Sequence, residues 1–165
     1  MKSDILILSI TKYMLSNYYG INNSDVKIYK NHWGKPMIRG ISNVHFNFSH
    51  TNDIIVGAFS TKQIGIDVEK VRRFNPKILK LFCSKEEMSD LSTIEDMHRL
   101  TQIWSIKESY LKMLGVGLNL PMNKYSTCRL DNQIRLKGKN GLISNVSFNL
   151  VSAKNIVISV CYILI

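Results

Sequence analysis

Two carboxylates, Asp67 and Glu69, stand two positions apart in GIDVEKV, inside an otherwise apolar run. The alternation predicts a β-strand, on which residues two apart project from the same face. Two neighbouring acids repel each other unless a cation lies between them, and carboxylate oxygens are the ligands that Mg²⁺ prefers. The pair could therefore hold a metal ion. Taken alone, however, the pattern more often means an amphipathic strand with a solvated acidic face.

A third acid occurs in IWSIKESYLKMLG, within a long helix predicted from His98 to Leu114 and ended by GVG. Trp104, Glu108 and Lys112 recur every four residues on one face of this helix. Tryptophan is unusual on a purely solvated face, so we expect these side chains to line a cleft. The apolar stripe lies elsewhere and comprises Ile103, Ile106, Tyr110, Met113 and Leu114. Lys107 lies nearer that stripe, and we expect it either to extend along the stripe to the surface or to face a partner protein.

Two short segments could bind an anion. Ser49 and His50 end FNFSH, and a hydroxyl and an imidazole beside backbone N–H groups at a strand end suit a phosphate. Lys35 and Pro36 belong to GKP, which we expect to be a rigid loop that presents the lysine. Each signal is weak alone, since a single histidine is more often a structural residue.

Helices and strands must position these residues. Ser3 to Tyr19 predicts a helix with Leu6, Ile10, Tyr13, Met14 and Asn17 on its apolar stripe. A short strand (DVKIYKN), a loop (HWGKPMI) and three strands (HFNFS, DIIVGAFS, QIGIDVEKV) follow. Helices are predicted from Asn75-Pro76 and from SKEEMSDL, where Ser84 and Glu87 match a capping box. After the long helix, a meander of strands is predicted. A helix followed by strands therefore occurs twice in the chain, with a boundary between the two parts near Thr61.

Composition bounds the class of protein. The 165 residues carry a net charge of +10, which implies an anionic partner. The three cysteines lack metal-binding spacing, and the longest apolar run, Ile156 to Ile165, is about half of a membrane span. We therefore expect a cytoplasmic protein without membrane contact. No nucleic-acid recognition motif occurs, and the three acids would repel a phosphate backbone.

Five segments in order, WGKPMI, FNFSH, GIDVEKV, FCSKEE and WSIKESYLKMLGVGL, resemble the 4′-phosphopantetheinyl transferases of the larger, surfactin-synthetase-activating type. The last is similar to the family pattern W-x-x-K-E-S-x-x-K followed by G-x-G-L. The resemblance implies an α+β pseudo-dimer of two similar halves, each a helix packed on an antiparallel sheet. Residues 1–61 would form a shortened first half, and residues 62–165 a second half that carries the metal site.

The same resemblance implies an activity. Such enzymes transfer the phosphopantetheine arm of coenzyme A to a serine of an apo acyl or peptidyl carrier protein, and release adenosine 3′,5′-bisphosphate. Asp67, Glu69 and Glu108 match the ligands of Mg²⁺, which Mn²⁺ could replace. Glu108 is also the implied general base, so the implied catalytic residues are Glu108, Lys112 and Asp67.

The implied coenzyme A contacts come from both halves. Ser49 and His50 match residues on the pyrophosphate side, Lys112 matches a phosphate-contacting lysine, and Lys35 with Pro36 matches a loop beside the adenine nucleotide. Coenzyme A is polyanionic and carrier proteins are generally acidic, so both partners suit the net charge of +10.

One departure from the family bears on these expectations. The chain begins at what resembles the family's second helix, without the basic segment that helps to hold the 3′-phosphate. Lys30, Lys35 and Arg39 could substitute for it, or a homodimer could cover the gap. The alternative function is a truncated, inactive relative that binds coenzyme A or a carrier protein without transfer.

Overall fold

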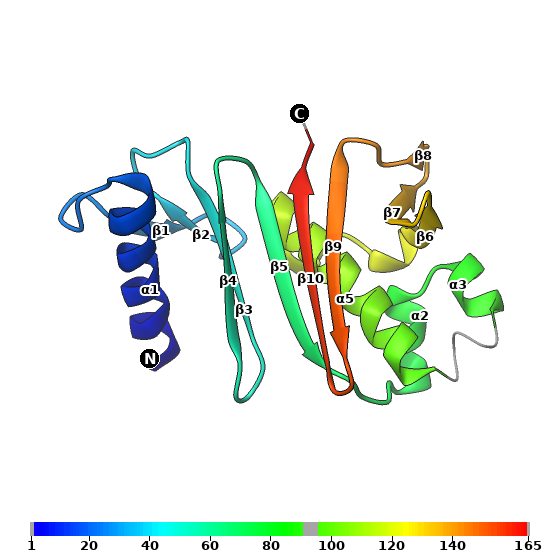
Figure 1. Cartoon of the computed structure of the whole chain (residues 1–165). Coiled ribbons are helices and arrows are strands. Elements are labelled where there is room, and N and C mark those ends of the chain that lie inside the picture. The colour runs from blue at the N-terminus through cyan, green and yellow to red at the C-terminus, as the bar shows by residue number, and fades with distance from the viewer. Residues whose placement is uncertain (1, 91–95, 165) are drawn as a thin grey trace.

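The computed structural model describes residues 2–90 and 96–164. It confirms the predicted α+β class, with helices packed against small antiparallel sheets (Figure 1). The first part of the chain forms α1 (Lys2–Tyr19), β1 (Ile28–Lys30), β2 (Pro36–Ile38), β3 (His45–His50) and β4 (Ile55–Ser60). The remainder forms β5 (Ile64–Lys70), α2 (Pro76–Phe82), α3 (Lys85–Ser89), α5 (Met97–Leu114), β6 (Ser126–Leu130), β7 (Gln133–Gly138), β8 (Gly141–Leu142), β9 (Val146–Ala153) and β10 (Ile156–Ile163).

The largest sheet positions the predicted carboxylates. Its order is β5–β10–β9, and β10 pairs antiparallel with both neighbours. Helix α5 packs across one face of this sheet (Figure 1). Gly65 permits the close approach, because a Cβ atom there would lie only 2.1 Å from the Ser109 carbonyl oxygen. The face of β5 that carries Asp67 is therefore covered by a helix rather than solvated.

The free edge of β5 meets the hairpin of β3 and β4. No backbone ladder is formed between β3 and β5 within the described part of the chain; side chains of β3 join them instead. The Ile66 N–H donates to Asn47 Oδ1 at 2.9 Å, and the Val68 N–H donates to Ser49 Oγ at 3.2 Å. Two side chains thus satisfy an edge that would otherwise be open.

Two hydrophobic clusters lie on either side of this junction. One is formed by Leu15, Val26, Ile38, Val44 and Phe46. The larger one packs α5 against β7, β9, β10 and α2, and includes Phe82, Ile103, Ile106, Leu136 and Phe148. The boundary near residue 61 stays a prediction, although each cluster is confined to one side of it.

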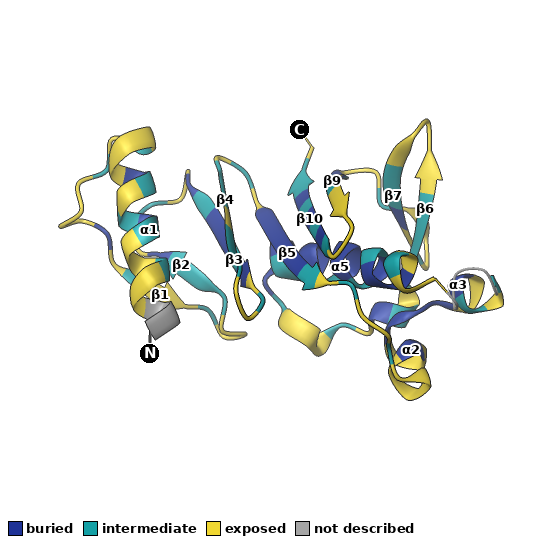
Figure 2. Cartoon of the chain, turned by 60° about the horizontal axis from the view of Figure 1, so that its bottom comes forward, coloured by how far each residue is buried: buried dark blue, intermediate teal, exposed yellow. Residues whose placement is uncertain are grey.

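Three local expectations were wrong. Pro36–Ile38 forms strand β2 rather than a loop, because it pairs with β1 across a turn in which Gly34 has φ 85°. The buried side of α1 carries Thr11 and Leu15, whereas the predicted stripe faces largely outward (Figure 2). Leu114 is 38% exposed, because α5 ends there.

Two helix caps and one turn agree with the sequence-based expectations. Helix α2 is capped by Asn75, and the capping box of Ser84 and Glu87 is present at α3. The turn between β6 and β7 uses Asp131 and Asn132, both with positive φ. Among the described residues, no helix combines the length and the apolar character needed to cross a bilayer.

Candidate active site between β3, β5 and α5

Asp67 lies at the centre of the candidate site and is only 2% exposed. Its Oδ1 accepts hydrogen bonds from Lys112 Nζ at 2.7 Å and from Ser49 Oγ at 3.0 Å. Lys112 Nζ also donates to Ser49 Oγ at 2.8 Å. Three residues predicted for the site, from β5, β3 and α5, are therefore in direct contact.

The second oxygen of this carboxylate has a different environment. Asp67 Oδ2 is buried and has no hydrogen-bond partner among the described residues. An unsatisfied buried acceptor costs free energy, and a cation or a ligand donor would remove that cost. Lys112, whose side chain is 26% exposed, supplies one positive charge and remains within reach of a ligand.

Glu108 and Glu69 share the electrostatic field of Asp67. Burial, and then the charge of Asp67, raise the pKa of Glu108 to about 7, while Lys112 opposes the shift. Burial and Asp67 likewise raise the pKa of Glu69. Asp67 disfavours the ionised forms of Glu108 and Glu69, so the site favours added positive charge.

Trp104 forms one wall, as its position on α5 predicts. Its indole Nε1 donates to Glu69 Oε1 at 2.9 Å, which fixes that carboxylate. Its ring meets Phe82 edge-on at 5.2 Å and lies 5.9 Å from Phe74. Arg72 approaches Glu69 Oε2 at 3.7 Å and lies over Phe74, a cation beside the acids that the sequence analysis missed. The face of α5 with Trp104, Glu108 and Lys112 is therefore turned toward β5.

The donor chemistry fits a divalent cation only in part. Within residues 2–90 and 96–164, no three His, Cys, Asp or Glu side chains form a group that could hold a metal ion. The free Asp67 Oδ2 and the raised pKa values of Glu108 and Glu69 nevertheless suit a hard cation. Asp67, Glu69 and Glu108 remain the residues that would hold it.

Lys35 is held by protein atoms. Its Nζ donates to the carbonyl oxygens of Lys112 at 2.7 Å, Met113 at 3.0 Å and Ile64 at 3.3 Å. Burial lowers the pKa of Lys35 to about 8. The ammonium group therefore lies at the end of α5 and is not directed into solvent.

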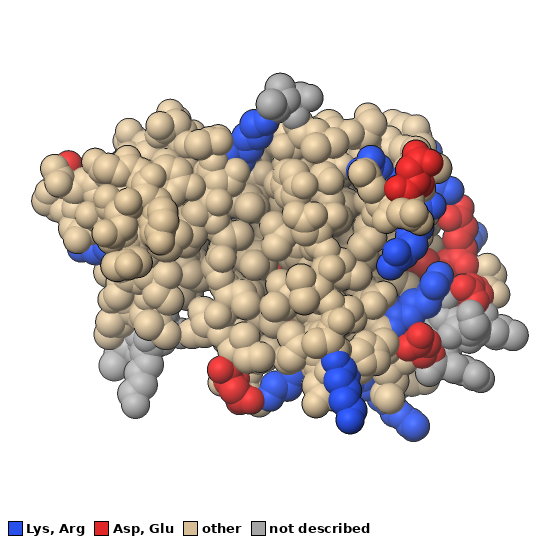
Figure 3. Space-filling model, in the orientation of Figure 1, with Lys and Arg blue, Asp and Glu red and all other residues tan. Residues whose placement is uncertain are grey.

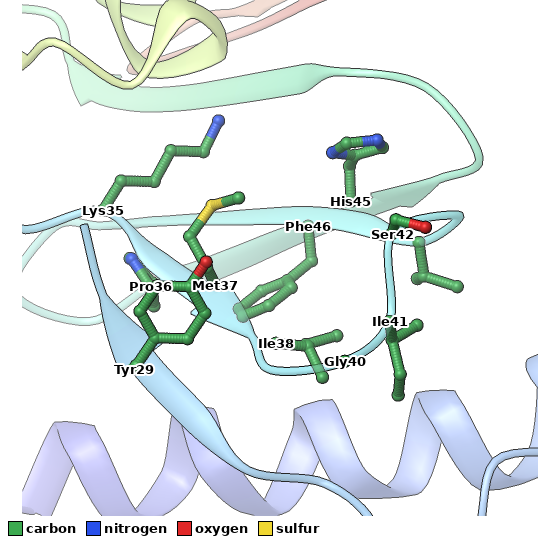
Figure 4. A pocket seen from close by; sticks show the side chains of 11 residues that line it. Tyr29, Lys35, Pro36, Met37, Ile38, Gly40, Ile41, Ser42, His45 and Phe46 are labelled. Atoms are coloured by element: carbon green, nitrogen blue, oxygen red, sulfur yellow. The ribbon is translucent and has the colours of Figure 1, made fainter.

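Lys35 and Pro36 also line a cavity of about 460 Å³ together with His45. Figure 4 shows the Lys35 and His45 side chains pointing the same way, Lys35 from the position before β2 and His45 from the start of β3. Burial, and then the charge of Lys35, lower the pKa of His45. Nothing in the sequence pattern marked His45, since only the fold brings it beside Lys35.

The side chains of Ser49 and His50 point in different directions. Ser49 is buried against Asp67, whereas His50 ends β3 and is exposed. Side chains alternate along a strand, so His50 leaves β3 on the face opposite Ser49. A role for His50 in binding coenzyme A stays a prediction.

Lys107 does not reach the surface, so that expectation was wrong. It is 1% exposed and donates to the Phe82 carbonyl at 2.7 Å and to Glu87 Oε2. Glu87 Oε1 in turn accepts the N–H and the hydroxyl of Thr127, both at 2.8 Å. This buried ion pair, whose two partners are both hydrogen-bonded to further protein groups, ties α5 to α2, α3 and β6.

The family comparison matches most of the second part of the chain. Residues 63–161 match the model of the 4′-phosphopantetheinyl transferase superfamily. The 4′-phosphopantetheinyl transferase Sfp of Bacillus subtilis (strain 168) is 36% identical over 126 residues, which are 74% of this chain and 54% of that protein. The 4′-phosphopantetheinyl transferase gsp of Aneurinibacillus migulanus is 32% identical over 72% of this chain and 50% of its own length. This chain thus spans about half the length of these relatives.

Solved structures agree on the fold. The Helicobacter pylori holo-[acyl-carrier-protein] synthase, determined in complex with coenzyme A, aligns with a TM-score of 0.51 at 21% identity. The alignment covers 61% of this chain and 99% of that one. The Neisseria meningitidis enzyme of the same name aligns with a TM-score of 0.54 at 15% identity, over 62% and 98% of the two chains.

Proposed function

Because this chain belongs to the 4′-phosphopantetheinyl transferase superfamily, we propose that it transfers the phosphopantetheine arm of coenzyme A to a serine of an apo carrier protein. One observation carries the proposal: the buried Ser49 and Asp67 and the partly exposed Lys112 are hydrogen-bonded to one another, and Glu108 lies in the field of Asp67. These residues come from three elements that are far apart along the chain, which a binding surface alone does not require.

The serine hydroxyl must lose a proton as its oxygen forms the new bond to phosphorus. A base works best when its pKa is near the operating pH, and burial raises the pKa of Glu108 to about 7. Glu108 is therefore our candidate to accept that proton. The bond that breaks is the pyrophosphate bond to adenosine 3′,5′-bisphosphate, the leaving group.

Charge on the pyrophosphate needs a counter-charge. Lys112 lies beside Asp67 at 2.7 Å and is partly exposed, so it could contact a bound phosphate. Asp67, Glu69 and Glu108 would hold Mg²⁺, or Mn²⁺ in its place, and the ion would neutralise the charge that develops on the pyrophosphate. Pro36, Ser49 and His50 are our further candidates for contacts with coenzyme A, and an acidic carrier protein suits the net charge of +10.

The test is a transfer assay read by intact mass. Purified protein, Mg²⁺ and coenzyme A are mixed with a panel of apo carrier proteins, and at least one should gain the phosphopantetheine mass. Asp67→Asn should transfer about 10²-fold more slowly, the usual scale for removing one key electrostatic group. Asp53→Asn, which removes an exposed acid paired with Lys70, should transfer at the wild-type rate. Wild-type transfer by Asp67→Asn would overturn the assignment of Asp67.

The inactive relative is the second candidate, because no three acids yet form a ready metal site among the described residues. It predicts that coenzyme A binds, as measured by calorimetry, while no carrier in the panel gains mass with Mg²⁺ or Mn²⁺. Transfer to any one carrier excludes it.

A further inference from the structure

The turn between β1 and β2 reaches from the first part of the chain to the C-terminal end of α5. Lys35 Nζ donates to the carbonyls of Lys112, Met113 and Ile64, as described above. From the same turn, Asn31 Nδ2 donates to the Gly115 carbonyl at 2.9 Å. Two side chains of one turn thus bind the last turn of α5 and the residue that ends it.

This turn is built so as to hold both side chains in place. Asn31 Oδ1 accepts the N–H groups of Trp33 at 3.0 Å and Lys35 at 2.8 Å. The Gly34 N–H donates to the Asn31 carbonyl at 2.9 Å, and the Asn31 N–H donates to the Lys35 carbonyl at 2.8 Å. Asn31 therefore shapes the turn with its oxygen and contacts α5 with its nitrogen.

The end of α5 is where such donors are needed. The last four carbonyls of a helix have no partner within the helix, and the helix dipole favours a cation at this end. The carbonyls of Lys112 and Met113 belong to that group, since α5 ends at Leu114. Gly115 leaves room for the turn, because a Cβ atom there would lie 3.0 Å from the Lys35 side chain and 3.2 Å from Asn31 Nδ2.

The contact bears on the candidate site through a single residue. Lys35 holds the carbonyl of Lys112, while the side chain of Lys112 reaches Asp67 Oδ1 at 2.7 Å and Ser49 Oγ at 2.8 Å. A displacement of the last turn of α5 would therefore move the ammonium group that we assign to the phosphates.

We propose that Asn31 and Lys35 form a latch that fixes the last turn of α5 and thereby positions Lys112. Lys35 is then a positioning residue that acts through Lys112, although its motif led us to expect a contact with the adenine nucleotide. The consequence for catalysis rests on the proposed function, whereas the effect on α5 does not.

The first experiment needs neither ligand nor activity. Amide hydrogen exchange is measured by NMR at Gly115 and Val116, whose N–H groups donate to the Leu111 carbonyl at 2.9 and 3.4 Å. Lys35→Met and Asn31→Ala should each speed exchange there by roughly tenfold, because each removes hydrogen bonds to the end of α5, while amides of β10 change little. Lys27→Met, which removes an exposed lysine of the same region, is the matched control and should change neither.

Lys35→Arg separates the latch from a contact that depends on charge alone. A guanidinium is planar and cannot aim three N–H groups at three carbonyls as an ammonium does, so exchange should remain fast. Exchange at Gly115 and Val116 that stays at the wild-type rate in both Lys35→Met and Asn31→Ala would overturn the proposal. If exchange became faster by the same factor in β10 and at the end of α5, the effect would be global, and the proposal of a local latch would be overturned.

Kinetics then test the link to Lys112. A latch predicts that Asn31→Ala lowers kcat and that Lys35→Met does so by a larger factor, each with a smaller change in the KM for coenzyme A. A direct nucleotide contact predicts instead a higher KM in Lys35→Met and no effect of Asn31→Ala, which would overturn the positioning role. If the wild type transfers nothing but exchange behaves as expected, the proposed function fails and the latch stands.

Discussion

Glu108 connects stability with chemistry at the scale of a single residue. In the folded protein burial raises its pKa from 4.5 to about 7, so between these values the folded state binds more protons than the unfolded state. Stability attributable to this group therefore falls as the pH rises through that interval. Glu108, which we propose as the base, thus makes the ligand-free protein less stable at neutral pH.

Glu108→Gln should remove this loss of folding stability at neutral and higher pH. In metal-free buffer we expect its Tm to exceed that of the wild type at pH 8 by roughly 2–4 °C, which corresponds to about 1 kcal/mol for a domain of this size. Near pH 4, where the wild-type carboxyl is protonated, the two Tm values should coincide. Calorimetric scans at both pH values measure the difference; a gap of the same size at pH 4 would mean that ionisation is not its cause.

Local spacing in the sequence predicted which candidate side chains share a face of one strand or one helix. Asp67 and Glu69 share a strand face, and Glu108 and Lys112 share a helix face, but only the resemblance to the family suggested that they act together, and their roles stay predictions. The hydrogen-bond partners of Lys35 and Lys107 were not predicted because they lie far along the chain: the carbonyls at the end of α5 for Lys35, and Glu87 for Lys107. A local sequence pattern does not predict which atoms from distant parts of the chain a lysine side chain will contact.

Gly65 governs the spacing between two elements. A Cβ atom at this position would lie 2.1 Å from the Ser109 oxygen and 2.3 Å from the Met113 nitrogen, both backbone atoms of α5 that cannot rotate away. The helix would have to move off β5, and Asp67 lies two residues further along that strand.

Gly65→Ala should therefore destabilise the protein by about 3 kcal/mol, the upper range for overpacking a tight contact. Gly138→Ala is the matched control, because a Cβ atom there would make only ordinary contacts from 3.6 Å outward. Urea denaturation measures both. Equal midpoints for the two variants would show that α5 and β5 can separate at little cost.

Elements with strong local signals were predicted well, and those held by distant pairing were not. The capping box of α3 and the C-terminal glycine cap of α5 were predicted correctly because the interacting residues lie within a few positions of one another. Strand β2 was taken for a loop, since three residues become a strand only through pairing with β1. Helix α1 has apolar residues on several faces, so periodicity could not select the side that packs.

At the scale of the whole molecule, the main feature is the apolar character of the exposed surface of α1. Five large apolar side chains of this helix are exposed, with values from 38% for Leu8 to 69% for Tyr18. Figure 3 shows that the α1 end of the face in view carries few charges, whereas Lys, Arg, Asp and Glu gather toward α2 and α3. Apolar area left in water forgoes about 25 cal/mol per Å², and such patches usually mark contacts.

We therefore expect either a homodimer that covers α1 or a monomer of low stability and low coenzyme A affinity. Light scattering with a coenzyme A titration separates the two. Leu6→Lys with Tyr13→Lys, two exposed positions seven residues apart on one side of the helix, should abolish any dimer without unfolding the protein. A stable wild-type monomer with a low micromolar Kd for coenzyme A would contradict both outcomes.

The order of strands in the β5–β10–β9 sheet has a consequence for synthesis. A ribosome delivers β5 early, but its ladder partner β10 begins only at Ile156, after α2, α3, α5 and β6 to β9 have been made. The hairpins of residues 28–60 can form on the nascent chain, whereas the strand that carries Asp67 must wait with one edge unpaired. Unpaired strand edges favour misassembly, and pairing between strands that are far apart in the sequence slows folding. In a cell, the yield of active protein should therefore depend on chaperones that shield β5 until translation has passed β10.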